Sequence, residues 1–173
     1  MRKPRDPDAP AKPKLGKAPV ETTTGACACG GVTIEIDLPA FWAWHDHSAA
    51  TRKASAGPYA TWIGCWKKKV RIAAAENLVS CYRDEAAGTS RSFCARCGSP
   101  LMYERPRSGG MVNLARNLFP GRTGREPRYH IALDQAAEWL WQGEPLAPLK
   151  GYPGVMWERP KRRRKHAPVQ GMF

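Results

Sequence analysis

Long apolar runs are missing from this sequence of 173 residues. No stretch approaches the roughly 20 consecutive apolar residues that cross a bilayer, so the sequence predicts no membrane-spanning segment. The first residues are charged and rich in proline with no apolar segment behind them, so no secretory signal is expected. These two absences favour a cytoplasmic, reducing location, where closely spaced cysteines bind metal ions more often than they form disulfides.

Acidic residues are scarce as well. The chain has 15 Asp and Glu against 28 Lys and Arg, which gives a formal net charge of +13. Most of the excess lies at the two ends: residues 1–19 hold six basic and two acidic side chains, and residues 156–173 hold six and one. Such basic tails have two possible roles. They can make weak, salt-sensitive and sequence-blind contact with nucleic acid, or they can act only as solubilising extensions.

Composition divides the chain into three parts. Residues 1–20 are expected to form a disordered basic arm rich in proline, and residues 158–173 a basic tail. Between them, residues 21–157 show short alternating apolar segments separated by Gly and Pro, of which residues 32–37 are the clearest. Helical signals are few: Ser48 can cap a helix that ends near Ala56, and Asp134 can cap one further turn. The sequence therefore predicts one mainly β domain.

Two closely spaced cysteine pairs lie far apart in this domain. Cys27 and Cys29 are separated by one residue, whereas Cys94 and Cys97 form a Cys-x-x-Cys pair followed by Gly98. A tetrahedral zinc site takes two thiolates from each of two such turns, and a glycine after the second pair can adopt the positive φ that closes its turn. A disulfide and ordinary buried thiols are the alternatives. Cys65 and Cys81 are isolated and receive no role.

Four stretches follow the pattern of one family, in order. They are residues 24–32 (TGACACGGV), 52–60 (RKASAGPYA) and 92–101 (SFCARCGSPL), and His130-Ile131 with Asp134 and Trp139. The chain resembles the glutathione-dependent formaldehyde-activating enzymes, which share their domain with centromere protein V. The resemblance extends over roughly residues 22–147.

The resemblance implies a zinc-stapled β-tent of short antiparallel strands with one or two short helices. One structural Zn²⁺ per chain would be held by the four cysteines of the two pairs, Cys27, Cys29, Cys94 and Cys97. It also implies carbon–sulfur lyase-type chemistry, the addition of the glutathione thiol to formaldehyde. The implied partner is thus glutathione or another small thiol or aldehyde.

One part of the chain departs from the family. Family members bind a second, catalytic zinc ion through three cysteines of a Cys-His-Cys-x-x-Cys-Arg-Lys stretch. Alignment on Arg52 and Lys53 places Asp46, Ser48 and Thr51 at those positions. Hydroxyl groups do not ionise near neutral pH as thiols do, so the three-thiolate site cannot form and the standard mechanism is not expected.

The candidate catalytic residues are His47, Asp46 and Ser48, which stand at or beside the missing ligands. They can make a hydrogen-bonded polar cluster, a weak two-histidine metal site with His45, or a Ser48–His47 nucleophilic pair. In an extended segment His45 and His47 point to one side and Asp46 to the other, which disfavours a grip on one ion. The nearby tryptophans are expected in the core or along a cleft, namely Trp42, Trp44 and Trp62.

Two classes of function follow. One is an enzyme of the family's carbon–sulfur lyase type, and the other is a non-catalytic zinc module whose basic tails bind nucleic acid or another acidic partner. Counting zinc ions per chain distinguishes a lost second site from a rebuilt one.

Overall fold

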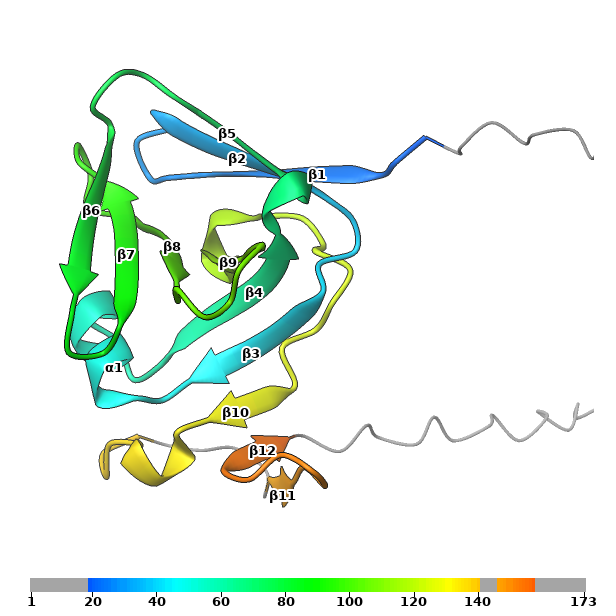
Figure 1. The fold of residues 1–173 in the computed structure, drawn as a ribbon, viewed down its shortest axis with the longest axis vertical. Coiled ribbons are helices and arrows are strands. Elements are labelled where there is room, and N and C mark those ends of the chain that lie inside the picture. Colours follow the sequence, from blue (N-terminus) through cyan, green and yellow to red (C-terminus); the bar gives the residue numbers. More distant parts are fainter. Residues whose placement is uncertain (1–18, 141–145, 158–173) are drawn as a thin grey trace, which may run out of the picture.

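The computed structural model describes residues 19–140 and 146–157 (Figure 1). The predicted arm (residues 1–20) and tail (residues 158–173) lie almost wholly outside these residues. The described chain is mainly β, with two sheets and a single α-helix, α1 (Ala49–Ser55), which confirms the predicted fold class. Within the part of the chain that is described, no helix has the length and apolar character needed to cross a membrane.

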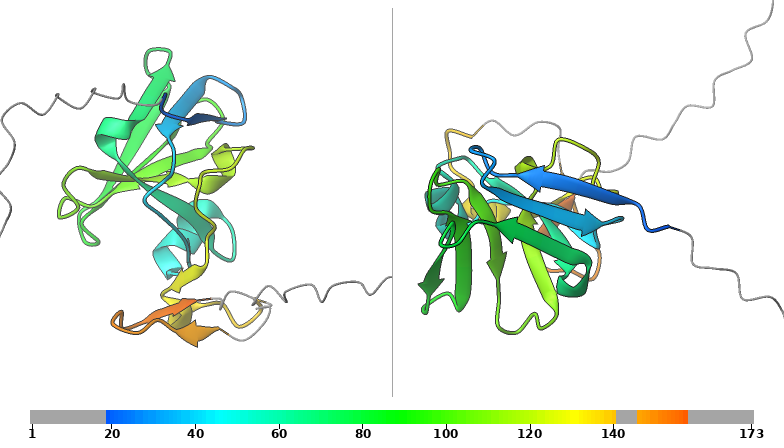
Figure 2. Two further views of the ribbon diagram at one scale, coloured as in Figure 1. Left: turned by 90° about the vertical axis from the view of Figure 1, so that its right-hand side faces the viewer. Right: turned by 90° about the horizontal axis from the view of Figure 1, so that it is seen from above.

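A small sheet lies at one end of the molecule (Figure 2). It has three antiparallel strands in the order β1 (Thr22–Ala26), β2 (Val32–Asp37) and β5 (Val70–Ala74). The second sheet has nine strands, in the spatial order β11 (Ala147–Pro148), β12 (Val155–Trp157), β10 (Tyr129–Ile131), β3 (Trp42–Asp46), β4 (Ala60–Trp66), β9 (Met111–Ala115), β8 (Pro100–Glu104), β7 (Thr89–Cys94) and β6 (Val79–Asp84). Three short 3-10 turns complete the described elements: η1 (Lys67–Lys69), η2 (Arg116–Leu118) and η3 (Leu133–Gln135).

Strand β2 has the alternation that its sequence predicts. Val32, Ile34 and Ile36 are completely buried, whereas the residues between them are half-buried. Successive side chains of a strand point to opposite faces, so these three residues all face one core. Ile63 of β4 and Leu101 of β8 are equally buried there, which shows that the core is shared by both sheets.

Of the two predicted helix caps, one is confirmed and one is wrong. Ser48 caps α1 as predicted, because its side-chain oxygen accepts a hydrogen bond from the backbone N–H of Thr51 at 3.3 Å. The cap assigned to Asp134 is wrong. The turn η3 begins at Leu133 and its preceding residue is Ala132, whose φ of 51° already reverses the chain without a side-chain cap.

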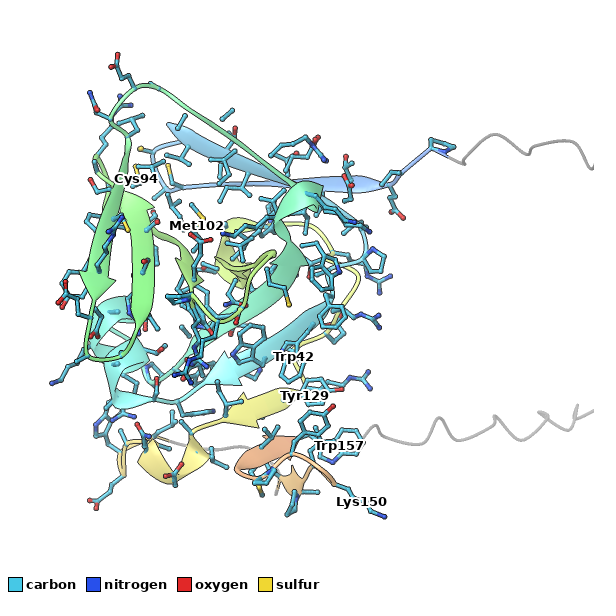
Figure 3. All side chains as sticks on the ribbon, viewed as in Figure 1. Trp42, Cys94, Met102, Tyr129, Lys150 and Trp157 are labelled. Carbon is cyan, nitrogen blue, oxygen red and sulfur yellow. The ribbon has the colours of Figure 1, made fainter. Side chains whose placement is uncertain are left out.

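Strand β3 gives no strong local signal, because its burial does not alternate. Ala43, Trp44 and Asp46 are all buried. The strand lies between antiparallel β4 and parallel β10, and Trp42 stacks on Tyr129 of β10 with ring centroids 5.1 Å apart (Figure 3). Ala43 and Trp44 point to opposite faces of the sheet and are both buried, so β3 is covered on both faces and lacks the polar positions from which alternation is recognised.

Candidate functional site

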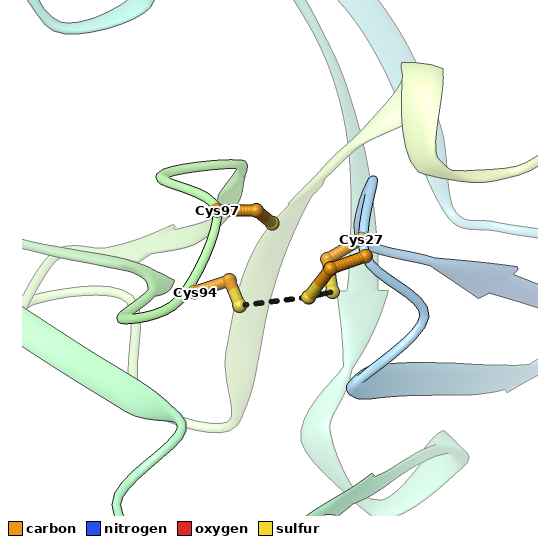
Figure 4. A group of neighbouring side chains, drawn as sticks. Cys27, Cys94 and Cys97 are labelled. Atoms are coloured by element: carbon orange, nitrogen blue, oxygen red, sulfur yellow. Dashed lines mark hydrogen bonds between the residues drawn. The ribbon is translucent and has the colours of Figure 1, made fainter.

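The four cysteines of the two pairs lie together, although they come from distant parts of the chain. Cys27 and Cys29 are in the turn from β1 to β2, and Cys94 and Cys97 are at the turn from β7 to β8. Their sulfur atoms all lie within 4.8 Å of one another (Figure 4). The Cys27–Cys29 sulfur distance is 3.5 Å and the Cys29–Cys94 distance is 3.8 Å, and all four thiols are free. The group can hold one metal ion.

Backbone geometry aims the sulfurs inward. Gly30 and Gly98 both have a φ of 72°, which lets each turn close tightly. The two turns are also joined to each other, since the Ala28 N–H donates a hydrogen bond to the Ser99 hydroxyl at 3.0 Å. The Val32 N–H points at the Cys27 sulfur, 3.3 Å away. A buried N–H beside a sulfur atom stabilises the thiolate form, which is the form that binds metal.

The ionised form of the four-cysteine group requires a cation, because its thiolates lie close together. Hydrogen bonds from the Ser99 hydroxyl and backbone lower the pKa of Cys97 to about 5. The Gly31 N–H lowers the pKa of Cys29, but the adjacent Cys27 thiol and burial outweigh it and raise the pKa to about 11. Crowded thiolates repel one another, so the four groups cannot ionise together without a positive ion between them. Four sulfur donors at these separations fit zinc.

The residues at the family's second zinc site bond to one another instead. The Asp46 carboxylate accepts hydrogen bonds from the Ser48 N–H and from the Thr51 hydroxyl, both at 2.9 Å. Asp46 and Thr51 are buried, and Ser48 caps the helix that Thr51 belongs to. All three side chains are thus engaged in fixing the start of α1. In residues 19–140 and 146–157, the four-cysteine group is the only set of three or more potential ligands close enough to hold an ion. The three residues do not fit a second zinc ion.

The histidines pair in a way that the local sequence does not indicate. His47 Nε2 lies 2.9 Å from His130 Nδ1, whereas His45 Nδ1 lies 2.9 Å from the Thr61 hydroxyl. His130 reaches this place because β10 runs parallel to β3. The Ser48 hydroxyl accepts from the Thr51 N–H, and no hydrogen bond joins it to His47 in the described structure. The arrangement therefore shows a histidine pair and gives no support to a serine–histidine pair.

His47 should make stability depend on pH. It is buried, and burial lowers its pKa below the ordinary value of 6.5. The unfolded chain therefore takes up a proton first as the pH falls, so the contribution of His47 is present above about pH 6.5 and is lost on acidification. Urea unfolding at about pH 7.5 and about pH 5.5 should show a smaller loss for His47→Gln than for the wild type. An equal loss in both proteins would contradict this, and the comparison cancels any acid-induced loss of metal.

A pocket of about 220 Å³ lies beside α1. Helix α1, the strands β6, β7 and β8 and the cysteine turn all contribute to it. Its lining residues are Thr51, Ala54, Ser55, Trp62, Tyr82, Arg91, Ser92, Phe93, Gly98, Pro100 and Met102. Of the three tryptophans, only Trp62 lines this pocket, and Trp44 and Trp62 are both part of the core. The pocket therefore opens onto Thr51, one of the three residues that the family resemblance places at a second zinc site.

Fold and site define a small β domain with a four-cysteine group that can hold a metal ion. The sequence matches the family described as glutathione-dependent formaldehyde-activating enzyme over residues 22–135, and the chain belongs to that family. Among solved structures it is similar to a crystal structure of a Rhodobacter sphaeroides protein, with 20% sequence identity and a TM-score of 0.48. That match covers 57% of this chain and 88% of the other. No curated protein matches the sequence.

Proposed function

We propose that the four-cysteine group holds one structural Zn²⁺, and that the pocket beside α1 binds thiol–aldehyde adducts and acts on their carbon–sulfur bond without a second zinc ion. The observation that carries the proposal is the position of Thr51. Thr51 lines the pocket, and its hydroxyl donates a hydrogen bond to the Asp46 carboxylate at 2.9 Å. When bound, the zinc ion supplies the link between the two turns and takes no part in the reaction.

The hydroxyl of Thr51 suits the proton transfer that such an adduct needs. When a thiol adds to an aldehyde, a sulfur–carbon bond forms, the C=O double bond becomes a C–O single bond, and the thiol proton ends on that oxygen. Breakdown reverses each change. Because the hydrogen of Thr51 points to Asp46, a lone pair of its oxygen is left to accept the adduct's hydroxyl hydrogen. Asp46 then acts through Thr51 and holds it in that orientation.

The other candidate catalytic residues fit this role less well. Ser48 uses its side chain to cap α1, and His47 is bonded to His130. Neither residue lines the pocket. We therefore assign Ser48 to holding the helix, and we assign the contact with the adduct to Thr51.

Metal analysis and exchange spectroscopy test the proposal together. We expect one zinc ion per chain, and faster exchange between glutathione, formaldehyde and their adduct when the protein is present. Thr51→Val should reduce that acceleration by about tenfold or more, because it removes the hydroxyl while preserving shape. Ser55→Ala is the matched control, since Ser55 also lines the pocket from α1 but bonds only to the Thr51 carbonyl. A second zinc ion, or an unchanged rate in Thr51→Val with full zinc content, would contradict the proposal.

The alternative, a zinc module that binds nucleic acid or another acidic partner through its basic tails, concerns residues outside the described ranges. The pocket favours the first function over this alternative, because binding through the tails would not require a cavity beside Thr51.

A further inference from the structure

Arg91 is the one charged residue among those that line the pocket. It belongs to β7, is half-buried, and its guanidinium carbon lies 6.0 Å from the centroid of the Tyr103 ring. Among the described residues, no carboxylate lies within ion-pair distance of this guanidinium. A guanidinium that is partly removed from water and left without a counter-ion attracts a carboxylate strongly, because two parallel N–H groups match its two oxygens.

The rest of the pocket is mainly apolar. Trp62, Phe93 and Met102 line it together with Ala54 and Pro100. Two of its hydroxyl groups already donate their hydrogens within the protein, those of Thr51 and Ser55. Ser92 and Tyr82 add two further hydroxyl groups to the lining. Arg91 is thus the one charged group that a ligand meets in the pocket, while the body of the ligand meets mainly apolar side chains.

The size of the pocket limits that body. A cavity of roughly 150 Å³ binds benzene, which has six carbon atoms. By that measure the pocket, at about 220 Å³, encloses about nine non-hydrogen atoms. An aromatic ring with a carboxylate attached has this size, whereas a tripeptide such as glutathione can place only one arm inside.

We propose that this pocket binds a compact carboxylate with an apolar body, its acid group on Arg91 and its body against Trp62, Phe93 and Met102. The inference deepens the proposed function by naming the ligand class of the same pocket, and it rests on that function only for the identity of the pocket. It concerns binding and not turnover. The thiol partner of an adduct would accordingly be an acid.

Benzoate and benzamide are suitable probes, because they share one shape and differ in charge. We expect the zinc-loaded wild type to bind benzoate more tightly than benzamide in a calorimetric or NMR titration. Arg91→Gln should weaken benzoate binding by about tenfold or more and leave benzamide within about twofold. Phe93→Ala should weaken both probes, because it removes part of the apolar wall.

Arg105→Gln is the matched control. Its guanidinium lies 5.9 Å from the same Tyr103 ring but outside the pocket lining, so both affinities should stay unchanged. Equal affinity of the wild type for both probes, no binding of benzoate, or benzoate binding that survives Arg91→Gln with full zinc content would overturn the inference. If Thr51→Val leaves exchange unchanged while Arg91→Gln abolishes benzoate binding, only the carbon–sulfur chemistry fails. If Thr51→Val slows exchange while Arg91→Gln leaves benzoate binding unchanged, only the inference of a carboxylate ligand fails.

Discussion

Replacing Cys94 with serine should leave the protein unfolded or insoluble. Cys94 is completely buried, its sulfur lies 3.8 Å from that of Cys29, and its turn joins β7 to β8. A structural zinc site contributes about 10–16 kcal/mol in small zinc domains, whereas whole domains are stable by only about 5–15 kcal/mol. Loss of the ion therefore removes as much free energy as the fold has to spare. Soluble yield, zinc content and circular dichroism measure the effect.

Cys81→Ser is the control for this substitution, because Cys81 is exposed and lies outside the four-cysteine group. It should express and bind zinc like the wild type. Removing zinc from the wild type with a chelator should give the same unfolded state as Cys94→Ser. A soluble Cys94→Ser protein with native circular dichroism, or a wild type that stays folded after chelation, would show that the metal does not hold the turns together.

Replacing Asp46 with alanine should lower the free energy of unfolding by about 2–4 kcal/mol. Asp46 is buried and accepts two hydrogen bonds, from the Ser48 N–H and the Thr51 hydroxyl. Without the carboxylate the buried Thr51 hydroxyl and the partly buried Ser48 N–H both lose their acceptor, which costs more than a lost surface contact. Urea denaturation with zinc present measures the change, and zinc content should stay at one ion per chain because the cysteine turns are untouched.

Asp46→Asn gives the comparison that separates packing from charge. It keeps the shape and one acceptor oxygen, so it should cost clearly less than Asp46→Ala. The proposed reaction should nevertheless slow in Asp46→Asn, since an amide cannot draw the hydrogen of Thr51 as a carboxylate does. Equal stability of Asp46→Ala and the wild type would mean that the start of α1 does not depend on this network.

Several elements could be predicted because their signals are local. The alternation of Val32, Ile34 and Ile36 gives β2, and the hydroxyl of Ser48 before an alanine-rich segment gives the cap of α1. The four cysteines were identified by their spacing, because a tetrahedral zinc site commonly takes two thiolates from each of two tight turns, and this pattern does not depend on the residues between the turns. Strands β11 and β12 were not predicted, since two and three residues are too few to show a period.

The site shows the same division. The family resemblance, aligned on Arg52 and Lys53, made Asp46, Ser48 and Thr51 doubtful as zinc ligands, because oxygen atoms stand where that pattern has thiols. That the three bond to one another around the first turn of α1 follows from side-chain geometry at close range. The His47–His130 pair needed the parallel alignment of β3 and β10, which joins residues 83 positions apart. No local pattern reports which strands become neighbours.

The amino-acid sequence by itself determined the mainly β class and the four thiols that can hold a metal ion, because each depends on residue type and short-range spacing. It also shows that no cysteine stands at residues 46, 48 and 51, where the resemblance places the second site. The tertiary structure alone decided that Arg91, Phe93 and Met102 meet Thr51 around one pocket. The physical reason is that a pocket is made by side chains from separate strands and a helix. Which of these side chains come together depends on how the strands and the helix pack, and no local sequence pattern indicates that packing.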